Sequence, residues 1–244
     1  MERARLTRYG MLSVTGDDAR EFLHAQLTRD IRGLPADRAA LAGWCSAKGR
    51  LLATLLVIPA PQGFLMQLSR DIAAPVAKRL SMFVLRSKVK VADESDRWTQ
   101  DGLWDVESAA PEVAWSGGVA TVRVGERRYL QLGPSSAMTT EPTAREEVWT
   151  LQEIRAGRPL ITSATQDQFV PQMVNFEKLG GIDWQKGCYP GQEIVARAQY
   201  RGQVKRRMVH LHAPAGTDVV PGAEYQGGVV VDRAGDELLA VMPV

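Results

Sequence analysis

The residues best suited to chemistry lie in one short stretch, residues 186–193, which reads KGCYPGQE. Its thiol, Cys188, lies among two glycines and a proline, residue types that let a backbone turn sharply. We therefore expect Cys188 on an exposed loop rather than inside a helix or strand. After the proline and the second glycine, residues 192–198 contain few helix breakers and predict a helix.

A thiol just ahead of a helix start lies near unpaired N–H groups and the positive end of the helix dipole. Lys186 and Arg197 add positive charge close by in the sequence. Such surroundings lower the pKa of a thiol, so Cys188 is predicted to be a reactive, functional cysteine. Gln192 and Glu193, in the first turn of the helix, offer acceptors for the N–H groups of a ligand. The alternative is that Cys188 is a small buried hydrophobic residue, a common fate of a free cysteine.

The composition is that of a globular protein with a hydrophobic core. Of the 244 residues, 45% are hydrophobic and 24% are charged, and the net charge is +2. This charge gives no general reason to expect binding to nucleic acid or to an anionic membrane. No apolar run approaches the ~20 residues of a membrane span, and no signal-type apolar segment follows the N-terminus. We therefore expect a cytoplasmic protein with no membrane partner.

The cysteine count limits the metal chemistry. Cys45 and Cys188 are far apart and have neither C-x-x-C nor zinc-site spacing. An iron–sulfur cluster normally takes four cysteine thiolates, so the chain alone cannot supply a complete cluster site. The histidines, His24, His210 and His212, lie away from both cysteines in the sequence, and His24 is expected at the surface or the edge of the core. No metal site is predicted.

The secondary structure expected around the loop that carries Cys188 indicates an α+β fold. Strands are expected at residues 7–14, 41–46, 51–58, 64–68, 88–92, 103–106, 119–124, 129–132 and 207–212, with further short strands to the C-terminus. A helix is expected from residue 16 to about 30, and another at residues 71–86 with Phe83 and Val84 on its apolar face. A polar break at residues 93–97 marks a candidate internal boundary.

One further helix has a sequence start signal. Thr143 and Glu146 have the spacing of a capping box, which opens a helix at this point. Its apolar residues, Val148, Leu151 and Ile154, are expected to point inward.

Basic residues gather between the predicted helix and the last strands: Arg201, Lys205, Arg206 and Arg207. One interpretation is a solvated strand surface. The other is an anion site that faces the Cys188 loop, since guanidinium groups suit carboxylates and phosphates. A ligand with carboxylates would suit this patch, whereas a long RNA usually needs a broader basic face and stacking aromatics.

The sequence resembles the YgfZ family of folate-binding-fold proteins, relatives of the aminomethyltransferase (T-protein) of the glycine cleavage system. The family signature is K-G-C, an aromatic residue, any residue, then G-Q-E, with a basic residue four positions later. Residues 186–193 together with Arg197 match it completely. Other matching stretches follow in order over nearly the whole chain: residues 21–30, 48–50, 85–89, 155–159 and 169–173.

The resemblance implies an aminomethyltransferase-like architecture. Two interlaced ferredoxin-like units would fill residues 1–200, and residues 201–244 would form a small C-terminal β-barrel, around a pocket for tetrahydrofolate. It further implies support for iron–sulfur cluster assembly or repair in client enzymes, including tRNA-modifying ones, with Cys188 as the reactive residue. The residues expected to bind the cofactor are Lys186, Tyr189, Gln192, Glu193 and Arg197.

The expected partners are folate and iron–sulfur client or scaffold proteins, one of which would complete any cluster. No direct nucleic-acid partner is expected, and the chain is expected to be a monomer.

One departure from the T-protein bears on whether the chain is an enzyme. The T-protein carries an acidic pair shortly after a Gly-rich hairpin, and the nearest positions here are Ala53 and Thr54. Neither can carry a charge, so aminomethyl transfer by that mechanism is not expected, and the fold is expected to serve other chemistry. Two alternatives stay open: a folate-dependent one-carbon transferase with Glu193 as general base, and an RNA-binding helper of tRNA modification that uses the basic residues.

Overall fold

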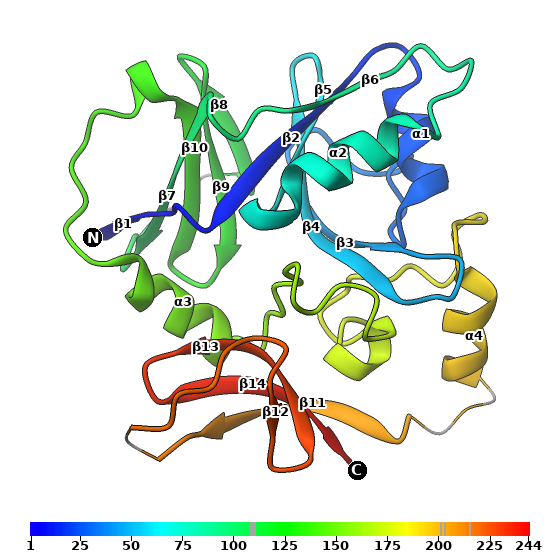
Figure 1. Cartoon of the computed structure of the whole chain (residues 1–244). Coiled ribbons are helices and arrows are strands. Elements are labelled where there is room, and N and C mark those ends of the chain that lie inside the picture. Colours follow the sequence, from blue (N-terminus) through cyan, green and yellow to red (C-terminus); the bar gives the residue numbers. More distant parts are fainter. Residues whose placement is uncertain (108–110, 201, 203, 215) are drawn as a thin grey trace. The chain divides into compact units, whose positions relative to one another are not determined.

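The computed structural model describes residues 1–244 except 108–110, 201, 203 and 215 (Figure 1). Its helices are α1 (Ala19–Gln26), α2 (Ala73–Ser81), α3 (Glu146–Arg155) and α4 (Gln192–Tyr200), with short 3₁₀ helices η1 (Arg70–Ile72), η2 (Ser135–Ala137) and η3 (Pro171–Val174). Its strands are β1 (Glu2–Arg5), β2 (Tyr9–Thr15), β3 (Ala40–Cys45), β4 (Leu51–Ala60), β5 (Gly63–Ser69), β6 (Lys90–Asp93), β7 (Trp98–Trp104), β8 (Val113–Ser116), β9 (Val119–Gly125), β10 (Arg128–Pro134), β11 (Arg206–His212), β12 (Glu224–Tyr225), β13 (Gly228–Ala234) and β14 (Glu237–Pro243). Separate helices and largely antiparallel sheets confirm the predicted α+β class.

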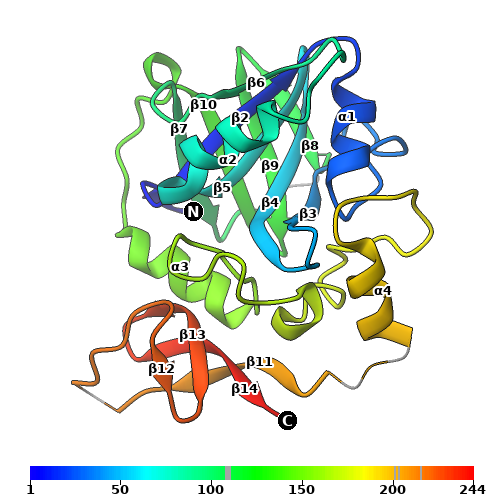
Figure 2. The ribbon, with the colours of Figure 1, turned by 45° about the vertical axis from the view of Figure 1, so that its right-hand side comes forward.

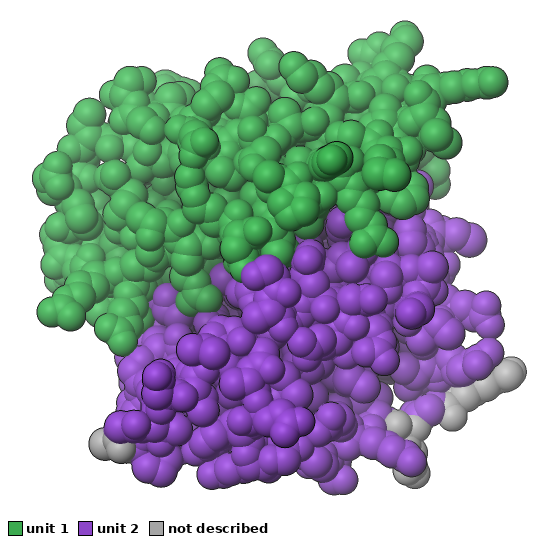
Figure 3. Space-filling model, in the orientation of Figure 1, with its two compact units in different colours: residues 1–22, 31–40, 56–149 green, residues 23–30, 41–55, 150–244 purple. Residues whose placement is uncertain are grey.

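Contacts divide the chain into two compact units, which Figure 3 colours separately. The first unit comprises Met1–Phe22, Ile31–Ala40 and Leu56–Trp149, and the second comprises Leu23–Asp30, Leu41–Leu55 and Thr150–Val244. Each unit therefore joins segments that are far apart in the sequence. The boundaries expected near residues 93–97 and at residue 200 stay predictions. Within the residues described, no helix is long and apolar enough to cross a membrane.

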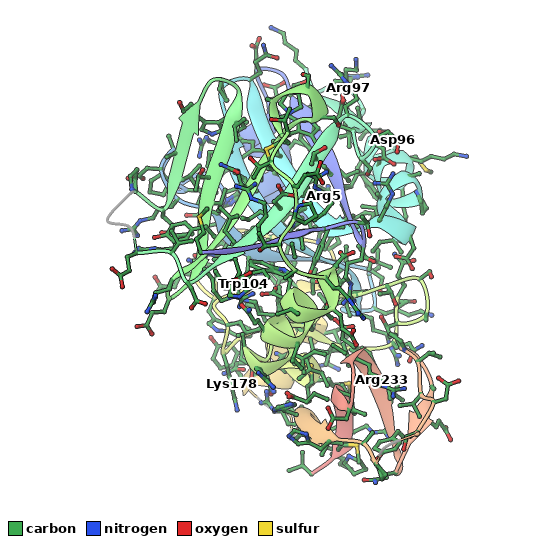
Figure 4. The ribbon with its side chains drawn as sticks, turned by 90° about the vertical axis from the view of Figure 1, so that its left-hand side faces the viewer. Arg5, Asp96, Arg97, Trp104, Lys178 and Arg233 are labelled. Atoms are coloured by element: carbon green, nitrogen blue, oxygen red, sulfur yellow. The ribbon has the colours of Figure 1, made fainter. Side chains whose placement is uncertain are left out.

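The first unit contains a five-stranded sheet in the order β1-β7-β10-β9-β8. Asp101 of β7 lies fully buried in it and binds two guanidinium groups of β1. Arg3 Nη1 lies 2.7 Å from Asp101 Oδ2, and Arg5 Nε, from the side chain labelled in Figure 4, lies 2.5 Å from Oδ1. A buried carboxylate needs such compensation, so these ion pairs fix β1 against β7.

A second five-stranded sheet has the order β3-β4-β5-β2-β6, and α2 lies against β2 and β6 (Figures 1 and 2). The predicted helix over residues 71–86 is shorter, because α2 ends at Ser81. Leu85 adopts a left-handed conformation with φ of 48°, which a continuing α-helix does not allow. Phe83 is 44% exposed, so its predicted place on the core face is wrong.

Helix α3 begins where predicted, but the predicted capping box does not form. Glu146 Oε1 instead accepts hydrogen bonds from the backbone N–H groups of Thr7 and Arg8, at 2.8 and 2.9 Å. Thr143 Oγ1 accepts one from the backbone N–H of Arg3 at 2.9 Å. The two side chains therefore hold the N-terminal segment, a tertiary role that local spacing does not reveal.

The inward face of α3 also differs from the prediction at one position. Ile154 is fully buried as predicted, and Trp149, which the sequence pattern did not single out, is only 3% exposed. Val148 is 40% exposed, so its predicted inward orientation is wrong.

The second unit ends in a four-stranded antiparallel sheet with the order β11-β14-β13-β12. One face of this sheet contributes Met208, Leu239 and Val241 to a core cluster that also contains Cys45 and Ile154. The other face carries a smaller cluster. Strand periodicity in residues 207–212 thus predicted β11 correctly.

Candidate functional site

Cys188 is exposed on the loop of residues 186–191 that leads into α4, as the sequence predicted. The helix starts at Gln192, where the backbone N–H groups of Ile194 and Val195 bond to the carbonyl of Gly191. The alternative of a small buried hydrophobic residue is therefore wrong for Cys188. We refer to residues 186–191 as the cysteine loop.

Lys186 anchors the cysteine loop to the C-terminal end of α1. Its side chain is buried, and its ammonium donates hydrogen bonds to the carbonyls of His24 and Leu27, the latter at 2.5 Å. These carbonyls lie at the C-terminal end of α1, where backbone acceptors are unpaired and the helix dipole is negative. The ring of Tyr189 lies 5.1 Å from the same nitrogen. The charge of Lys186 is thus directed into the protein.

Two glycines set how closely the cysteine loop approaches the turn after β3. Gly191 has φ of +77°, and a β-carbon there would lie 2.3 Å from the carbonyl oxygen of Ser46. Gly49, in that turn, has φ of +70°, and a β-carbon there would lie 2.8 Å from Cβ of Ile194. Both positions need a left-handed backbone and the absence of a side chain.

Tyr189 fills the space between the cysteine loop and the core. Its side chain is buried, and burial, together with the neighbouring Cys45, raises the pKa of its hydroxyl well above the ordinary value. Burial likewise raises the pKa of the Cys45 thiol to about 12. Tyr189 therefore acts as an apolar anchor that leaves the neighbouring Cys188 outside.

Several stretches that carry the family resemblance come together in the second unit. The segment of residues 27–30 binds the approach to the cysteine loop, because Thr28 Oγ1 donates to the carbonyl of Gly181 at 2.6 Å. Gln172 Nε2, from the stretch at residues 169–173, donates to the carbonyl of Val195 in α4 at 2.7 Å. Together with the turn containing Gly49, these contacts surround the cysteine loop with residues that are distant in the sequence.

The exposed face of α4 carries the remaining charged residues of the signature. Arg197 Nη2 lies 3.2 Å from Glu193 Oε1, and the side chains are 65% and 84% exposed. An exposed pair of this kind is weak, so both groups are free to exchange partners with a ligand. Gln192 is half-buried at the start of the helix. Of the predicted site residues, the structure thus places Glu193 and Arg197 toward solvent, and Lys186 and Tyr189 inside.

Ala53 and Thr54, the positions expected to lie nearest to the acidic pair of the T-protein, are buried. Thr54 Oγ1 donates to the carbonyl of Pro159 at 3.0 Å and accepts from the N–H of Ile161 at 3.1 Å. Neither position offers a carboxylate.

The basic stretch is partly used within the protein. Arg207 Nη1 donates to Glu177 and to the carbonyl of Gln172, and Arg206 Nη2 donates to the carbonyl of Gly227 at 2.7 Å. Arg207 and Lys205 also line a surface depression of about 460 Å³ beside the end of α4, which Cys188 does not line. The predicted contribution of Arg201 lies outside the described residues.

His24 is the residue near the site that sequence reasoning missed. It is 6% exposed, and its Nε2 has no hydrogen-bond partner among the described residues. A β-carbon at Gly187 would lie 3.6 Å from that nitrogen, and Asp30 Oδ1 lies 2.9 Å from Nδ1 on the other side of the ring. The imidazole therefore lies directly behind the cysteine loop. The sequence indicates a position for His24 at the surface or the edge of the core and does not predict its position next to the cysteine loop.

Comparisons with known proteins show which proteins this chain is similar to. The tRNA-modifying protein YgfZ of Serratia proteamaculans is 30% identical over 237 residues, which cover 86% of this chain and 71% of that protein. The protein of the same name from Sodalis glossinidius is 31% identical over 242 residues, with 87% and 73% covered. No family model matches the chain.

Among solved structures, the glycine cleavage system aminomethyltransferase T from Bartonella henselae matches with a TM-score of 0.77 and 14% identity. The match covers 99% of this chain and 78% of that one. At this identity the likeness shows the fold alone, and it confirms the predicted aminomethyltransferase-like fold.

Proposed function

The chain belongs to the YgfZ family, and from this premise we propose that it is a tetrahydrofolate-binding protein that supports iron–sulfur cluster assembly or repair. Its clients would include tRNA-modifying enzymes in the cytoplasm, in keeping with the name of its relatives. The observation that carries the proposal is the exposed thiol of Cys188 on a loop that buried residues hold in place. A client protein can reach such a thiol while this chain remains folded.

The cysteine count limits how the thiol is used. Cys45 is buried in the core, so Cys188 is the thiol that a partner can reach. A single thiolate supplies one ligand of a cluster that normally takes four. Cys188 therefore acts as a transient ligand, and a scaffold or client protein supplies the remaining ligands.

The charged residues of α4 suit a ligand that carries carboxylates, as tetrahydrofolate does. Arg197 has an exposed guanidinium whose partner is an even more exposed carboxylate, so the guanidinium can turn to a ligand carboxylate at little cost. Lys186 suits this role less well, because its ammonium is already bound to backbone carbonyls. The fit thus favours Arg197 as the contact to the ligand, with Gln192 and Glu193 beside it.

Calorimetric titration of tetrahydrofolate into the full chain tests the ligand. We expect binding to the wild type and at least a tenfold weaker affinity in Arg197→Ala. Arg123→Ala, an exposed arginine of β9, is the matched control and should bind like the wild type. Absence of binding to the wild type would refute the folate proposal.

Complementation of a bacterial strain that lacks its own YgfZ protein tests the thiol. Cys188→Ser should fail to restore iron–sulfur-dependent tRNA modification, whereas Cys45→Ala should restore it if the variant folds. Full restoration by Cys188→Ser would remove the thiol from the mechanism. Turnover of a methylamine donor with tetrahydrofolate and no iron would instead favour a one-carbon transferase.

A further inference from the structure

Two histidines and a carboxylate meet at the end of the C-terminal sheet. His210 and His212 are two residues apart on β11, so their side chains lie on the same face of the strand. The register of β11 with β14 pairs His212 directly with Glu237. The three side chains therefore share one face at one end of an antiparallel pair.

The distances suit a common ligand. One ligand atom from each of the three residues lies within 4.8 Å of the others, and the two imidazole centroids are 5.2 Å apart. His210 Nε2 already lies 2.7 Å from Glu237 Oε2. A metal ion would replace this hydrogen bond by two metal–ligand bonds, with small side-chain rotations and no change in the strands.

The exposure of the three groups suits entry of an ion from solvent. Glu237 is 4% exposed at the base of the cluster, while the side chains of His210 and His212 are 36% and 66% exposed. The carboxylate is thus fixed and the imidazoles are accessible. A surface site of this kind leaves a coordination position for water.

A second layer of charges orients the carboxylate. Arg155 of α3 donates from Nε to both oxygens of Glu237 at 3.0 and 3.1 Å, and from Nη2 to Oε1 at 2.5 Å. The carboxylate of Asp236 lies 3.9 Å from His212 Nδ1. With neutral imidazoles, two carboxylates face one guanidinium, so the cluster is net negative before any ion binds. Groups that hold a ligating carboxylate in place in this way are typical of metal sites.

We propose that His210, His212 and Glu237 form a binding site for a divalent transition-metal ion of the zinc type. Two imidazoles and one carboxylate are a ligand set that zinc accepts, with water in the remaining position. The site does not include Cys188 and does not depend on the proposed function. Arg155 weakens the attraction of the carboxylate for a cation, so we expect micromolar rather than nanomolar affinity.

Titration of zinc chloride into chelator-treated protein tests the site. The full chain carries Cys188→Ser throughout, because an exposed thiol also binds zinc. We expect one equivalent of zinc to bind, and at least tenfold weaker binding in His212→Ala and His210→Ala. His212 is largely exposed, so its replacement should not disturb folding, which circular dichroism checks.

Glu224→Gln, which replaces an exposed carboxylate of β12 at the other edge of the same sheet, is the matched control and should bind zinc like the parent. Loss of affinity in both histidine variants with retention in this control supports the site. Absence of zinc binding, or equal binding in the parent and both histidine variants, overturns it.

Discussion

The two cysteines of the second unit offer the same chemistry in opposite surroundings. Cys45, at the end of β3, is 2% exposed in the main core cluster, and burial raises the pKa of its thiol to about 12. Cys188 is exposed on the cysteine loop. Both flank the same contact, because the turn that follows Cys45 packs against Gly191. Burial of the thiol, and not the type of residue, separates an inert cysteine from a usable one.

The largest effect should be seen in alkylation of the native protein. At pH 8 a thiol with a pKa of about 12 is ionised to roughly one part in 10⁴, and Cys45 is also shielded from the reagent. We expect iodoacetamide to modify Cys188 at least ~10³-fold faster than Cys45. Mass spectrometry of peptides taken over time measures both rates. Similar rates at the two positions would contradict the comparison.

The next effect concerns the glycine that brings the cysteine loop close to the turn after Cys45. Gly191→Ala places a β-carbon 2.3 Å from the carbonyl oxygen of Ser46 at a φ of +77°. We expect the free energy of unfolding to fall by about 3 kcal/mol or more. Gly180→Ala is the matched control, since its φ is +72° but the nearest atom is 3.9 Å away, and it should cost about 1 kcal/mol. Urea unfolding measures both, and equal losses would show that close packing at Gly191 is unimportant.

Replacement of the buried lysine should have a somewhat smaller effect. Lys186→Met removes two charge-assisted hydrogen bonds and leaves the carbonyls of His24 and Leu27 without that donor. We expect a loss of about 2 kcal/mol in the free energy of unfolding. Arg197→Met, which removes an exposed ion pair of the same signature, should cost about 0.5 kcal/mol or less. A larger loss from Arg197→Met than from Lys186→Met would reverse the assigned roles.

The smallest effect is a pH dependence that Cys45 alone should cause. Its thiol stays protonated in the folded protein up to about pH 12, while in the unfolded chain it ionises near the ordinary cysteine pKa of 9.0. The unfolded state then binds fewer protons, so stability falls as pH rises through this window, by about 1 kcal/mol at pH 10. The wild type should lose this amount relative to Cys45→Ala in urea unfolding at pH 8 and pH 10. A constant difference between the two proteins would show that the buried thiol does not titrate in this way.

The cysteine loop could be predicted because its causes are local. Glycines and a proline around Cys188 impose a turn, and the absence of breakers after Gly191 allows α4 to form. The direction of Lys186 could not be predicted, because it depends on carbonyls of α1 that lie about 160 residues earlier in the chain.

Other differences have the same origin. Glu146 had the local spacing of a cap, but backbone N–H groups of the N-terminal segment compete for its carboxylate. Phe83 continued a helical pattern past the point where the backbone turns. His210 and His212 were visible as neighbours on one strand, whereas Glu237 joins them only through strand pairing. Turns and helices could be predicted because they depend on neighbouring residues, whereas contacts between residues far apart in the sequence could not.

The insertion of Lys186 beneath α1 bears on how this motif can be engineered. A synthetic peptide of residues 186–197 would contain the whole signature, including Arg197, but it would lack the carbonyls of His24 and Leu27 that hold the ammonium of Lys186. Transplanting the cysteine loop and its exposed thiol into another protein would require moving that distant segment and the turn containing Gly49 as well. The smallest unit that could be transferred therefore consists of three separate segments of the chain: the cysteine loop, the segment that contains His24 and Leu27, and the turn that contains Gly49.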